Sequence, residues 1–432
     1  MNLRINPVAT LRGTIDLPAS KSYSIRAFLV AACGGRSIIK NPSDCDDSLV
    51  AMSAARCLGA KITKNGKNSF RIDAPLISRP IRRINVKESG TVLRLILPLA
   101  AMSGGRVVVS GEGTLKGRPN HFLIEAMRRM GVKLSGTGPA GSIPIHIHGG
   151  KLQGGGVEID GSLSSQFISA LLIACPRLDQ DTELLISGKK IVSESYITMT
   201  LQILKKAGIG IRPNGRNAYF IPGRQHFAGL KSYSVPSDYG LAAFFMAAAS
   251  LIPSDVTFRG HFDDRFLQAD GQILHFLKRM GVRWERTSRA IRMRGPFQLK
   301  GGDFSLKDSP DLVPIMAVLA LFAKGRTRLL DIGHARAKES DRIEDLKKEL
   351  VKIGASLKAK EDSLTIDPGS SYKNDCYFDP HHDHRLAMAF SVLGLKLGAI
   401  VKDIECTRKS YPGFVLDLKK LVPRHLRLPK IV

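Results

Sequence analysis

Several short stretches of the chain place cations and hydroxyls where a helix is expected to begin. The first is PASKSYSIR, which carries Lys21, Ser22 and Arg26 directly before an apolar run. A helix start presents free backbone N–H groups and the positive end of the helix dipole, and both favour anions. Lys or Arg beside them adds charge-assisted contacts to phosphate or carboxylate. The pattern indicates a site for anionic groups.

The same arrangement recurs along the chain. ESGTVLRL sets Gly90 and Thr91 at a helix start with Arg94 one turn later, and GRPNHF sets Arg118 just before another start. One such start is explained as well by an ordinary solvated helix cap. Because the design recurs, we expect the helix starts to converge on one electropositive pocket. The remaining polar starts hold Ser164, Ser165 and Gln166; Lys338, Glu339, Asp341 and Arg342; and Asp383, His384 and Arg385.

The elements that position these residues repeat. A helical stretch that ends in glycine and leads into a strand-like run occurs five times, at Gly59, Gly131, Gly208, Gly281 and Gly354. Glycine closes a helix in the left-handed conformation and lets a strand depart. The near-constant spacing predicts six α/β units, with residues 414–422 as a degenerate sixth helix, and two domains of three units each are the natural grouping.

Two kinds of segment fill each predicted unit. RVVVSG and PIHIHG, residues 106–111 and 144–149, are typical of strands. SSQFISALLIACP and DYGLAAFFMAAASLIP, residues 164–176 and 238–253, predict helices so apolar that they are buried on most sides. The fold class is therefore α/β (α+β).

Composition restricts the class of protein. The 432 residues carry a net charge of +27, which fits either a polyanion partner or an anionic small substrate. The cations are spread along the chain and are not interleaved with aromatic residues, which disfavours nucleic acid. No apolar run is long enough for a membrane span, and no signal-peptide pattern opens the chain. Six cysteines without a C-x-x-C pair predict free thiols and a cytoplasmic location.

Three familiar nucleotide-binding or metal-binding motifs find no support in the sequence. GTGPAG, residues 136–141, matches a dinucleotide-binding pattern but leads into a strand-like run, not a helix. A G-x-x-x-x-G-K-[ST] loop is missing from the sequence. HHDH, residues 381–384, is contiguous and has no second ligand cluster to complete a metal site. We expect no metal and no cofactor.

The polar helix starts, together with SESYITMTLQILKKAG at 193–208 and CTRKSYPGF at 406–414, resemble in order the signature stretches of the 5-enolpyruvylshikimate-3-phosphate (EPSP) synthase family. The resemblance runs from about Leu17 to Phe414. Enzymes of that family transfer the enolpyruvyl group of phosphoenolpyruvate to the 5-hydroxyl of shikimate 3-phosphate and release phosphate. The resemblance implies the two-domain enolpyruvyl transferase fold, an inside-out α/β barrel with three βαβαββ units in each domain.

The resemblance also implies how the chain divides. We expect residues 1–16 with 235–432 to form the first domain and residues 17–234 the second, with the active-site cleft between them. The polar stretch near residues 231–238 agrees with a crossing between domains. We expect the enzyme to work as a monomer on its two small-molecule substrates, without nucleic acid or membrane.

Site residues are carried over by position. Those that match the family's contacts to shikimate 3-phosphate are Lys21, Ser22, Arg26, Ser164, Ser165, Gln166, Ser193, Tyr196, Asp311 and Lys338. Those that match its contacts to phosphoenolpyruvate are Lys21, Gly90, Arg118, Gln166, Arg342, Arg385 and Lys409. The candidate catalytic residues are Lys21, Asp311, Glu339 and His384.

The residue types suit the chemistry that the resemblance implies. Both substrates carry several negative charges, so several cations are needed to hold them together. Asp311 is the candidate base for the attacking hydroxyl, although the same residue is also explained as a helix cap. Glu339 and Lys21 are candidates for moving the proton at C3 of phosphoenolpyruvate, and His384 matches a position discussed as an acid or base. The sequence leaves the assignment of these protons open.

Two departures from the family pattern stand out. Glu88 occupies the position of the usual Asn in Asn-x-Gly-Thr, which brings an anion near the phosphoenolpyruvate pocket, where it caps a helix or pairs with a cation. The usual acidic Gly-Asp approach to the helix at 238–253 reads Pro236-Ser237-Asp238.

Three other functions compete. The sister transferase acting on UDP-N-acetylglucosamine uses Lys-Asn near its N-terminus and usually a Cys before Arg-Pro, whereas this chain has Lys21-Ser22 and Lys116. An RNA-acting or nucleic-acid-binding homologue, such as an RNA 3′-phosphate cyclase, would need a nucleotide-accepting His and an ATP site, which no motif supports. Retention of the charged candidate residues argues against a non-catalytic homologue.

Overall fold

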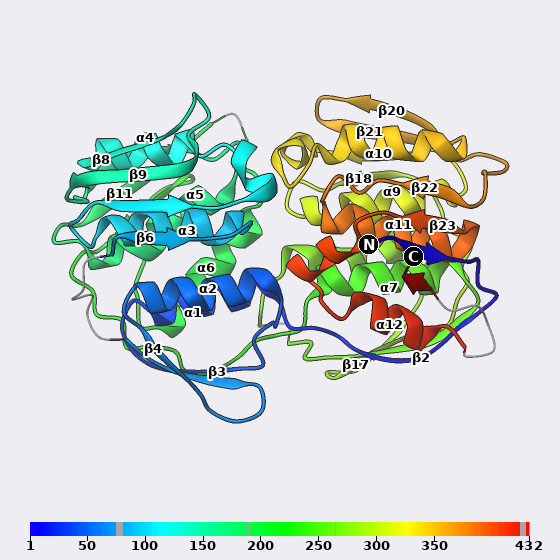
Figure 1. Cartoon of the computed structure of the whole chain (residues 1–432), viewed down its shortest axis with the longest axis horizontal. Helices are drawn as coiled ribbons and strands as arrows, with labels where there is room; N and C mark the ends of the chain where they lie inside the picture. The colour runs from blue at the N-terminus through cyan, green and yellow to red at the C-terminus, as the bar shows by residue number, and fades with distance from the viewer. Residues whose placement is uncertain (75–80, 189, 264, 424–428, 432) are drawn as a thin grey trace. The chain divides into compact units, whose positions relative to one another are not determined.

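The structure is a computed structural model, and it describes residues 1–74, 81–188, 190–263, 265–423 and 429–431. The chain divides into two compact units, which are shown in Figure 1. Unit 1 consists of Met1–Pro18 together with Pro236–Val432, and unit 2 consists of Ala19–Val235. The chain therefore leaves unit 1 and returns to it, with unit 2 as one continuous segment.

Three four-stranded sheets form unit 2. In each sheet the first two strands are parallel, as in the pairing of Ile159 with Ile186 in the first sheet. The third and fourth strands join antiparallel. The sheets, in spatial order, are β10 (Gly155–Asp160), β11 (Thr182–Ser187), β13 (Ala218–Ile221) and β12 (Arg212–Pro213); β14 (Lys231–Ser234), β3 (Gly35–Lys40), β5 (Ser69–Ala74) and β4 (Lys61–Lys64); and β6 (Arg83–Asn85), β7 (Val107–Ser110), β9 (Ser142–Gly150) and β8 (Val132–Thr137).

Unit 1 repeats the same sheet three times, again with one parallel pair followed by antiparallel pairs. The sheets are β2 (Leu11–Asp16), β15 (Ser254–Arg259), β17 (Ala290–Met293) and β16 (Glu285–Arg286); β18 (Asp303–Ser305), β19 (Thr327–Leu330), β21 (Ser363–Asp367) and β20 (Ser356–Lys360); and β22 (Cys376–Phe378), β23 (Ala399–Val401), β1 (Leu3–Ile5) and β24 (Lys430–Ile431). The predicted set of six βαβαββ units, three in each half, is confirmed.

Two of the six sheets take their first strand from a distant part of the chain. β2 pairs in parallel with β15, across some 240 residues, and β14 pairs in parallel with β3. These two strands flank the crossings between the units. The other three strands of each of these sheets come from one continuous stretch of the chain. The fourth is supplied by β2 or β14, which lies next to a crossing between the units.

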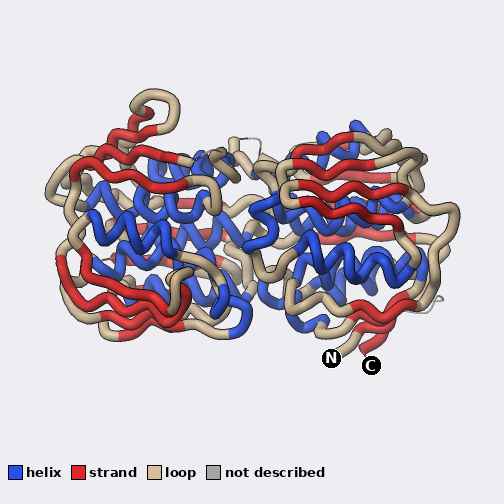
Figure 2. The backbone as a smooth tube through the Cα atoms, turned by 90° about the horizontal axis from the view of Figure 1, so that it is seen from above, coloured by secondary structure: helices blue, strands red, loops and turns tan. Residues whose placement is uncertain are grey.

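Six inner helices are found among the described residues. They are α1 (Lys21–Ala31), α3 (Gly90–Ala101) and α5 (Ser165–Ala174) in unit 2, and α7 (Tyr239–Leu251), α9 (Val313–Leu321) and α11 (His384–Leu397) in unit 1. Four of them, α1, α3, α5 and α11, begin at predicted polar starts; the other two predicted starts begin α4 (His121–Arg129) and α10 (Arg342–Leu350). Every residue of α7 and α9 is buried, and so are nearly all residues of α5, as predicted from their apolar sequences. Figure 2 shows that, within each unit, the sheets lie outside and helices lie within.

Six further helices among the described residues are amphipathic. They are α2 (Asp46–Cys57), α4 (His121–Arg129), α6 (Glu194–Lys206), α8 (Gln272–Arg279), α10 (Arg342–Leu350) and α12 (Phe414–Leu421). All five predicted glycines follow such a helix with a positive φ, between 83° at Gly354 and 96° at Gly59. The sixth helix, α12, forms where the degenerate repeat predicts it, but it ends at Val422 in an extended conformation without a glycine. Among the described residues, every helix is too short or too polar to traverse a lipid bilayer.

Candidate active site

The predicted polar stretches do begin helices. At all of them except α4, whose Asn120 makes no such bond, a Ser or Asp side chain accepts a hydrogen bond from a backbone N–H of the first turn, and the same holds for α7. This satisfies a donor that the helix itself leaves free. The capping residues are Ser20 of α1, Ser89 of α3, Ser164 of α5, Asp238 of α7, Asp341 of α10 and Asp383 of α11.

Arg26 lies between α1 and α6 inside unit 2. Its Nε donates to Thr200 Oγ1 at 2.8 Å, and its guanidinium also donates to the backbone carbonyls of Ser22 and Tyr196. Burial lowers the pKa of Arg26 to about 10, and nearby Tyr196 opposes that change. Three of the predicted shikimate 3-phosphate residues, Ser22, Arg26 and Tyr196, are thus brought together, next to Ser193 before α6.

Lys21 is the first residue of α1 and is largely buried. Its Nζ lies 3.1 Å from Oδ2 of Asp47, a buried residue of α2. A buried ammonium needs such a partner, because removing a charge from water without compensation is costly. The ion pair with Asp47 holds the ammonium group of Lys21, the lysine predicted to contact both substrates, at the start of an inner helix.

A second cluster in unit 2 is centred on Arg94 of α3. Its Nη1 donates to Gln166 Oε1 at 2.8 Å, and its Nη2 donates to the carbonyl of Pro119 at 2.9 Å. Gln166 in turn donates to Thr91 Oγ1 at 3.1 Å. Buried Arg94 therefore ties the starts of α3, α4 and α5 together and fixes the direction of the Gln166 amide.

Gly90 and Arg118 approach each other closely. A Cβ added at Gly90 would lie 2.8 Å from Nη1 of Arg118, which is closer than real Cβ contacts. Arg118 is buried in the segment between η1 (Gly113–Gly117) and α4. The structure thus brings two predicted phosphoenolpyruvate residues into contact, and glycine at position 90 leaves the room that the guanidinium occupies.

Glu88 does not cap α3. Ser89 caps the helix, because its hydroxyl accepts from the backbone N–H of Val92. Glu88 Oε2 instead accepts a hydrogen bond from Thr114 at 3.2 Å, and Gly113, at φ 56°, lies so close that a Cβ there would be 2.3 Å from the Glu88 carboxyl. The carboxylate that departs from the family pattern braces the η1 loop.

In unit 1, Arg342 is the centre of a buried ionic cluster. It is fully buried at the start of α10, and its guanidinium contacts three carboxylates: Asp383 at 2.7 Å, Asp311 at 2.8 Å and Glu339 at 3.1 Å. Burial alone would lower the pKa of Arg342, but Asp383, Asp311 and Glu339 together raise it well above its ordinary value. The cluster fixes a permanently charged guanidinium.

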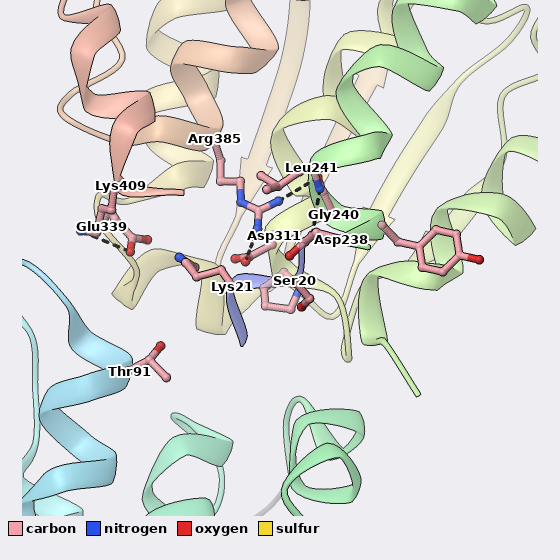
Figure 3. A network of polar contacts seen from close by, with 12 residues as sticks. Ser20, Lys21, Thr91, Asp238, Gly240, Leu241, Asp311, Glu339, Arg385 and Lys409 are labelled. Atoms are coloured by element: carbon pink, nitrogen blue, oxygen red, sulfur yellow. Dashed lines mark hydrogen bonds and ion pairs between the residues drawn. The ribbon is translucent and has the colours of Figure 1, made fainter. Parts of the chain in front are cut away.

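Asp311 joins Arg342 to a second guanidinium. Its Oδ2 accepts from Nη2 of Arg385 at 2.9 Å, while Nη1 of Arg385 donates to the carbonyl of Gly240 at 2.9 Å (Figure 3). Asp311 lies inside η4 (Pro310–Leu312) and is not the N-cap residue of either helix, which is Ser309 for η4 and Leu312 for α9. Instead it is a carboxylate held between two arginines.

The remaining predicted residues of unit 1 lie around this cluster. Glu339 pairs with Lys409 of η7 (Ile404–Lys409) at 3.6 Å (Figure 3). It also contacts Arg342. His384 is buried as the first residue of α11, next to Arg385, and half-buried Lys338 follows η5 (Gly333–Ala337). All the charged candidates of this half thus come from the ends of α9, α10, α11 and η7.

The histidines at 381 and 382 in the HHDH stretch lie beside carboxylates. His381 Nε2 lies 3.4 Å from Glu349, and His382 Nδ1 lies 2.5 Å from Asp403. Over the described ranges, no group of three or more His, Cys, Asp or Glu residues has an arrangement that could hold a metal ion. The third residue of the stretch, Asp383, is the carboxylate that both caps α11 and contacts Arg342.

Known relatives share both the sequence and the fold. The family described as EPSP synthase (3-phosphoshikimate 1-carboxyvinyltransferase) matches residues 5–418. The 3-phosphoshikimate 1-carboxyvinyltransferase of Methanosarcina mazei is 36% identical over 431 residues, which cover 98% of each chain. The chain belongs to the EPSP synthase family. The enzyme of the same name from Methanocella arvoryzae is 37% identical over 416 residues, covering 95% of this chain and 96% of that one.

Solved structures of EPSP synthases and related proteins have the same fold. The EPSP synthase of Acinetobacter baumannii superposes with a TM-score of 0.79 at 24% identity, over 98% of both chains. The enolpyruvyl transferase NikO of Streptomyces tendae superposes with a TM-score of 0.77 at 19% identity, over 97% of both chains. At these identities the likeness establishes the fold only.

Sequence reasoning missed two residues that organise this EPSP synthase site. Arg94 was recognised as a cation one turn into α3, but not as the group that orients Gln166 and also reaches Ser164 at 3.4 Å. Asp383 was recognised only as part of a polar helix start, although it contacts Arg342 and caps α11. The signal in the sequence was that Arg94 is a charged residue inside an otherwise apolar helix, which indicates a buried polar partner.

Proposed function

We propose that this chain is a 3-phosphoshikimate 1-carboxyvinyltransferase, a transferase that moves the enolpyruvyl group of phosphoenolpyruvate to the 5-hydroxyl of shikimate 3-phosphate. The hydroxyl oxygen bonds to C2 of phosphoenolpyruvate, its proton passes to a base and C3 gains a proton. The product of this addition is a tetrahedral intermediate that still carries phosphate. Phosphate then leaves C2 and one proton leaves C3, which restores the double bond.

The bracketing of Asp311 by Arg342 and Arg385, at 2.8 and 2.9 Å, supports the proposal most directly. Preorganised cations stabilise the negative charge of the addition step, because they need no reorientation when that charge develops. The carboxylate of Asp311 in the same cluster is a group that can accept the proton that the hydroxyl must lose. The cluster therefore supplies both functions that the addition requires.

Asp311 is the proposed acceptor of the hydroxyl proton. Glu339 and Lys21 are proposed to deliver and remove the proton at C3, with His384 as a further acid or base beside Arg385. Glu339 contacts both Arg342 and Lys409, so its charge is balanced by cations on two sides. Arg342, Arg385 and Lys409 are proposed to hold phosphoenolpyruvate.

The proposal also uses unit 2. Gly90, Arg118 and Gln166 are proposed to contact phosphoenolpyruvate, and Gln166 is already held in one orientation by Arg94. The remaining contacts are proposed for shikimate 3-phosphate, with Lys21 contacting both substrates. They are Ser22, Arg26, Ser164, Ser165, Ser193 and Tyr196 in unit 2, with Asp311 and Lys338 in unit 1.

The test is phosphate release from phosphoenolpyruvate by the purified protein. With shikimate 3-phosphate present, steady turnover is expected, and Lys21→Ala and Arg385→Ala should each lower it by about 10² or more, since electrostatic stabilisation is usually the largest catalytic contribution. The matched surface controls are Lys151→Ala and Arg259→Ala, whose side chains are mostly exposed. Release that depends on UDP-N-acetylglucosamine and not on shikimate 3-phosphate would overturn the proposal.

Two finer points belong to the same proposal. We infer a cytoplasmic location, supported by cysteines that are all free among the described residues, three of them fully buried. We also infer that the enzyme acts as a monomer, which light scattering on the active protein would check.

A further inference from the structure

Asp270 is a buried carboxylate that the proposed reaction does not use. It lies in η3 (Ala269–Gly271), directly before α8, and only 6% of the residue is exposed. The sequence around it, LQADGQILHF, gave no reason to single it out. A carboxylate so deeply buried is costly to ionise, so its surroundings decide its state.

Asp270 and Arg385 crowd the same point on α7. A Cβ added at Gly240 would lie 2.2 Å from Oδ2 of Asp270 and 2.9 Å from Nη1 of Arg385. Arg385 also donates to the Gly240 carbonyl from that same Nη1 (Figure 3). The carboxylate of Asp270 therefore lies near Nη1 of Arg385, on the side of α7. Asp311 contacts the other terminal nitrogen, Nη2 of Arg385.

Charged groups from four elements act on Asp270. Asp311 of η4 and Asp238 before α7 repel its negative charge, whereas Arg385 of α11 and Arg342 of α10 attract it. Burial is the largest effect, followed by Asp311, and together they raise the pKa of Asp270 to about 7. The carboxyl thus changes its charge near neutral pH, next to an arginine proposed to hold an anion.

We propose that Asp270 is a positioning residue for phosphoenolpyruvate, which holds a proton while the substrate occupies Arg385 and competes for that guanidinium as an anion when the substrate is absent. This inference rests on the proposed function. The geometry around Gly240 carries it, because the carboxylate and the guanidinium share one confined space. Anionic substrate bound to Arg385 would place further negative charge near Asp270 and so favour its protonated form.

The physical consequence is a linkage between proton and substrate. Below neutral pH, Asp270 is already protonated and phosphoenolpyruvate binds without competition. As pH rises above about 7, the free enzyme loses that proton, and binding the substrate requires its uptake. The apparent affinity then falls by up to about tenfold for each pH unit until the substrate complex also loses the proton.

The test compares the KM for phosphoenolpyruvate of wild type and Asp270→Asn between pH 6 and pH 9, at saturating shikimate 3-phosphate. Wild-type KM should rise about tenfold more than that of Asp270→Asn between pH 7 and pH 8.5, with kcat changing much less. The substrate's own titration is common to both proteins and cancels in the comparison. Asp303→Asn is the matched control, since Asp303 pairs with Arg328 on the surface of the same unit.

Equal pH dependence of KM in wild type and Asp270→Asn would overturn the inference while leaving the proposed function intact. A wild type that releases no phosphate would contradict the proposed function instead. If Asp270→Asn does not fold, difference infrared spectra of wild type at pH 8 decide the matter. Added phosphoenolpyruvate should produce a protonated carboxyl band, and its absence would overturn the inference.

Discussion

Nε of Arg342 donates a hydrogen bond to Oδ2 of Asp383 at 2.7 Å, and both side chains are buried. The same carboxylate accepts the backbone N–H of Arg385. One contact therefore couples the centre of the ionic cluster to the start of the helix that carries a second arginine.

Removing the Arg342 side chain should lower the stability of the protein. Arg342→Met would leave the buried carboxylate of Asp383 facing those of the partly buried Asp311 and Glu339, so we expect the free energy of unfolding to fall by about 3–5 kcal/mol. Asp383→Asn keeps a capping side chain for α11 and should cost less. Urea denaturation monitored by circular dichroism measures both. Equal stability of Arg342→Met and wild type would show that the cluster does not stabilise the fold.

Arg94 should affect catalysis through Gln166. Arg94→Gln removes the donor at 2.8 Å, and a hydrogen bond to a charged group contributes about 1.5–3 kcal/mol. We expect KM for the substrates that Gln166 contacts to rise roughly tenfold or more. Arg36→Gln, on the exposed face of β3, serves as the control. Unchanged KM in a folded Arg94→Gln protein would argue that the orientation of Gln166 is set elsewhere.

Gly90→Ala should displace the Arg118 guanidinium without unfolding the protein. The added Cβ would meet the far end of a flexible side chain at 2.8 Å, and Gly90 lies in ordinary helical backbone. We expect KM for phosphoenolpyruvate to rise by about tenfold, with the melting temperature nearly unchanged. Gly105→Ala, where a Cβ meets nothing within 4 Å, is the control. A kinetic effect of the same size in Gly105→Ala would remove this explanation.

Asp270 should make stability depend on pH. Its folded-state pKa of about 7 lies above the ordinary value of 3.8, so the folded protein binds this proton more tightly than the unfolded chain. The cost of ionising Asp270 is absent below about pH 4, grows as pH rises and is complete above pH 7. The melting temperature of Asp270→Asn, relative to wild type, should therefore increase between pH 5 and pH 8. A difference that stays constant over this range would contradict the assignment.

Local signals in the sequence predicted the repeat well. Each helix-ending glycine needs a positive φ, which is a property of one residue and its neighbours, so Gly59 and Gly354 could be recognised without a structure. The pairing of β2 with β15 could not, because a register between strands some 240 residues apart depends on how the whole unit packs. The first strands of the split units were accordingly not predicted.

The candidate site divides in the same way. Polar helix starts are local, and the sequence placed them correctly at α3, α5, α10 and α11. The choice of partner is not local: Arg342 meets Asp311 and Asp383, which lie 31 and 41 residues away in sequence. For that reason the ionic cluster, the role of Arg94 and the bracing position of Glu88 emerged only from the three-dimensional arrangement.

The pairing of β1 has a consequence for synthesis of the chain on the ribosome. Residues 3–5 emerge long before their partners β23 and β24, which follow only at residues 399–401 and 430–431. Unit 2 has all its strands once residue 234 has been added. Ribosome-bound chains stalled well beyond residue 235 should therefore protect residues 19–235 from protease, while β1 still lacks both of its partner strands. The half that is interrupted in sequence is therefore the half whose sheets are completed only after residues 399–431 have been added.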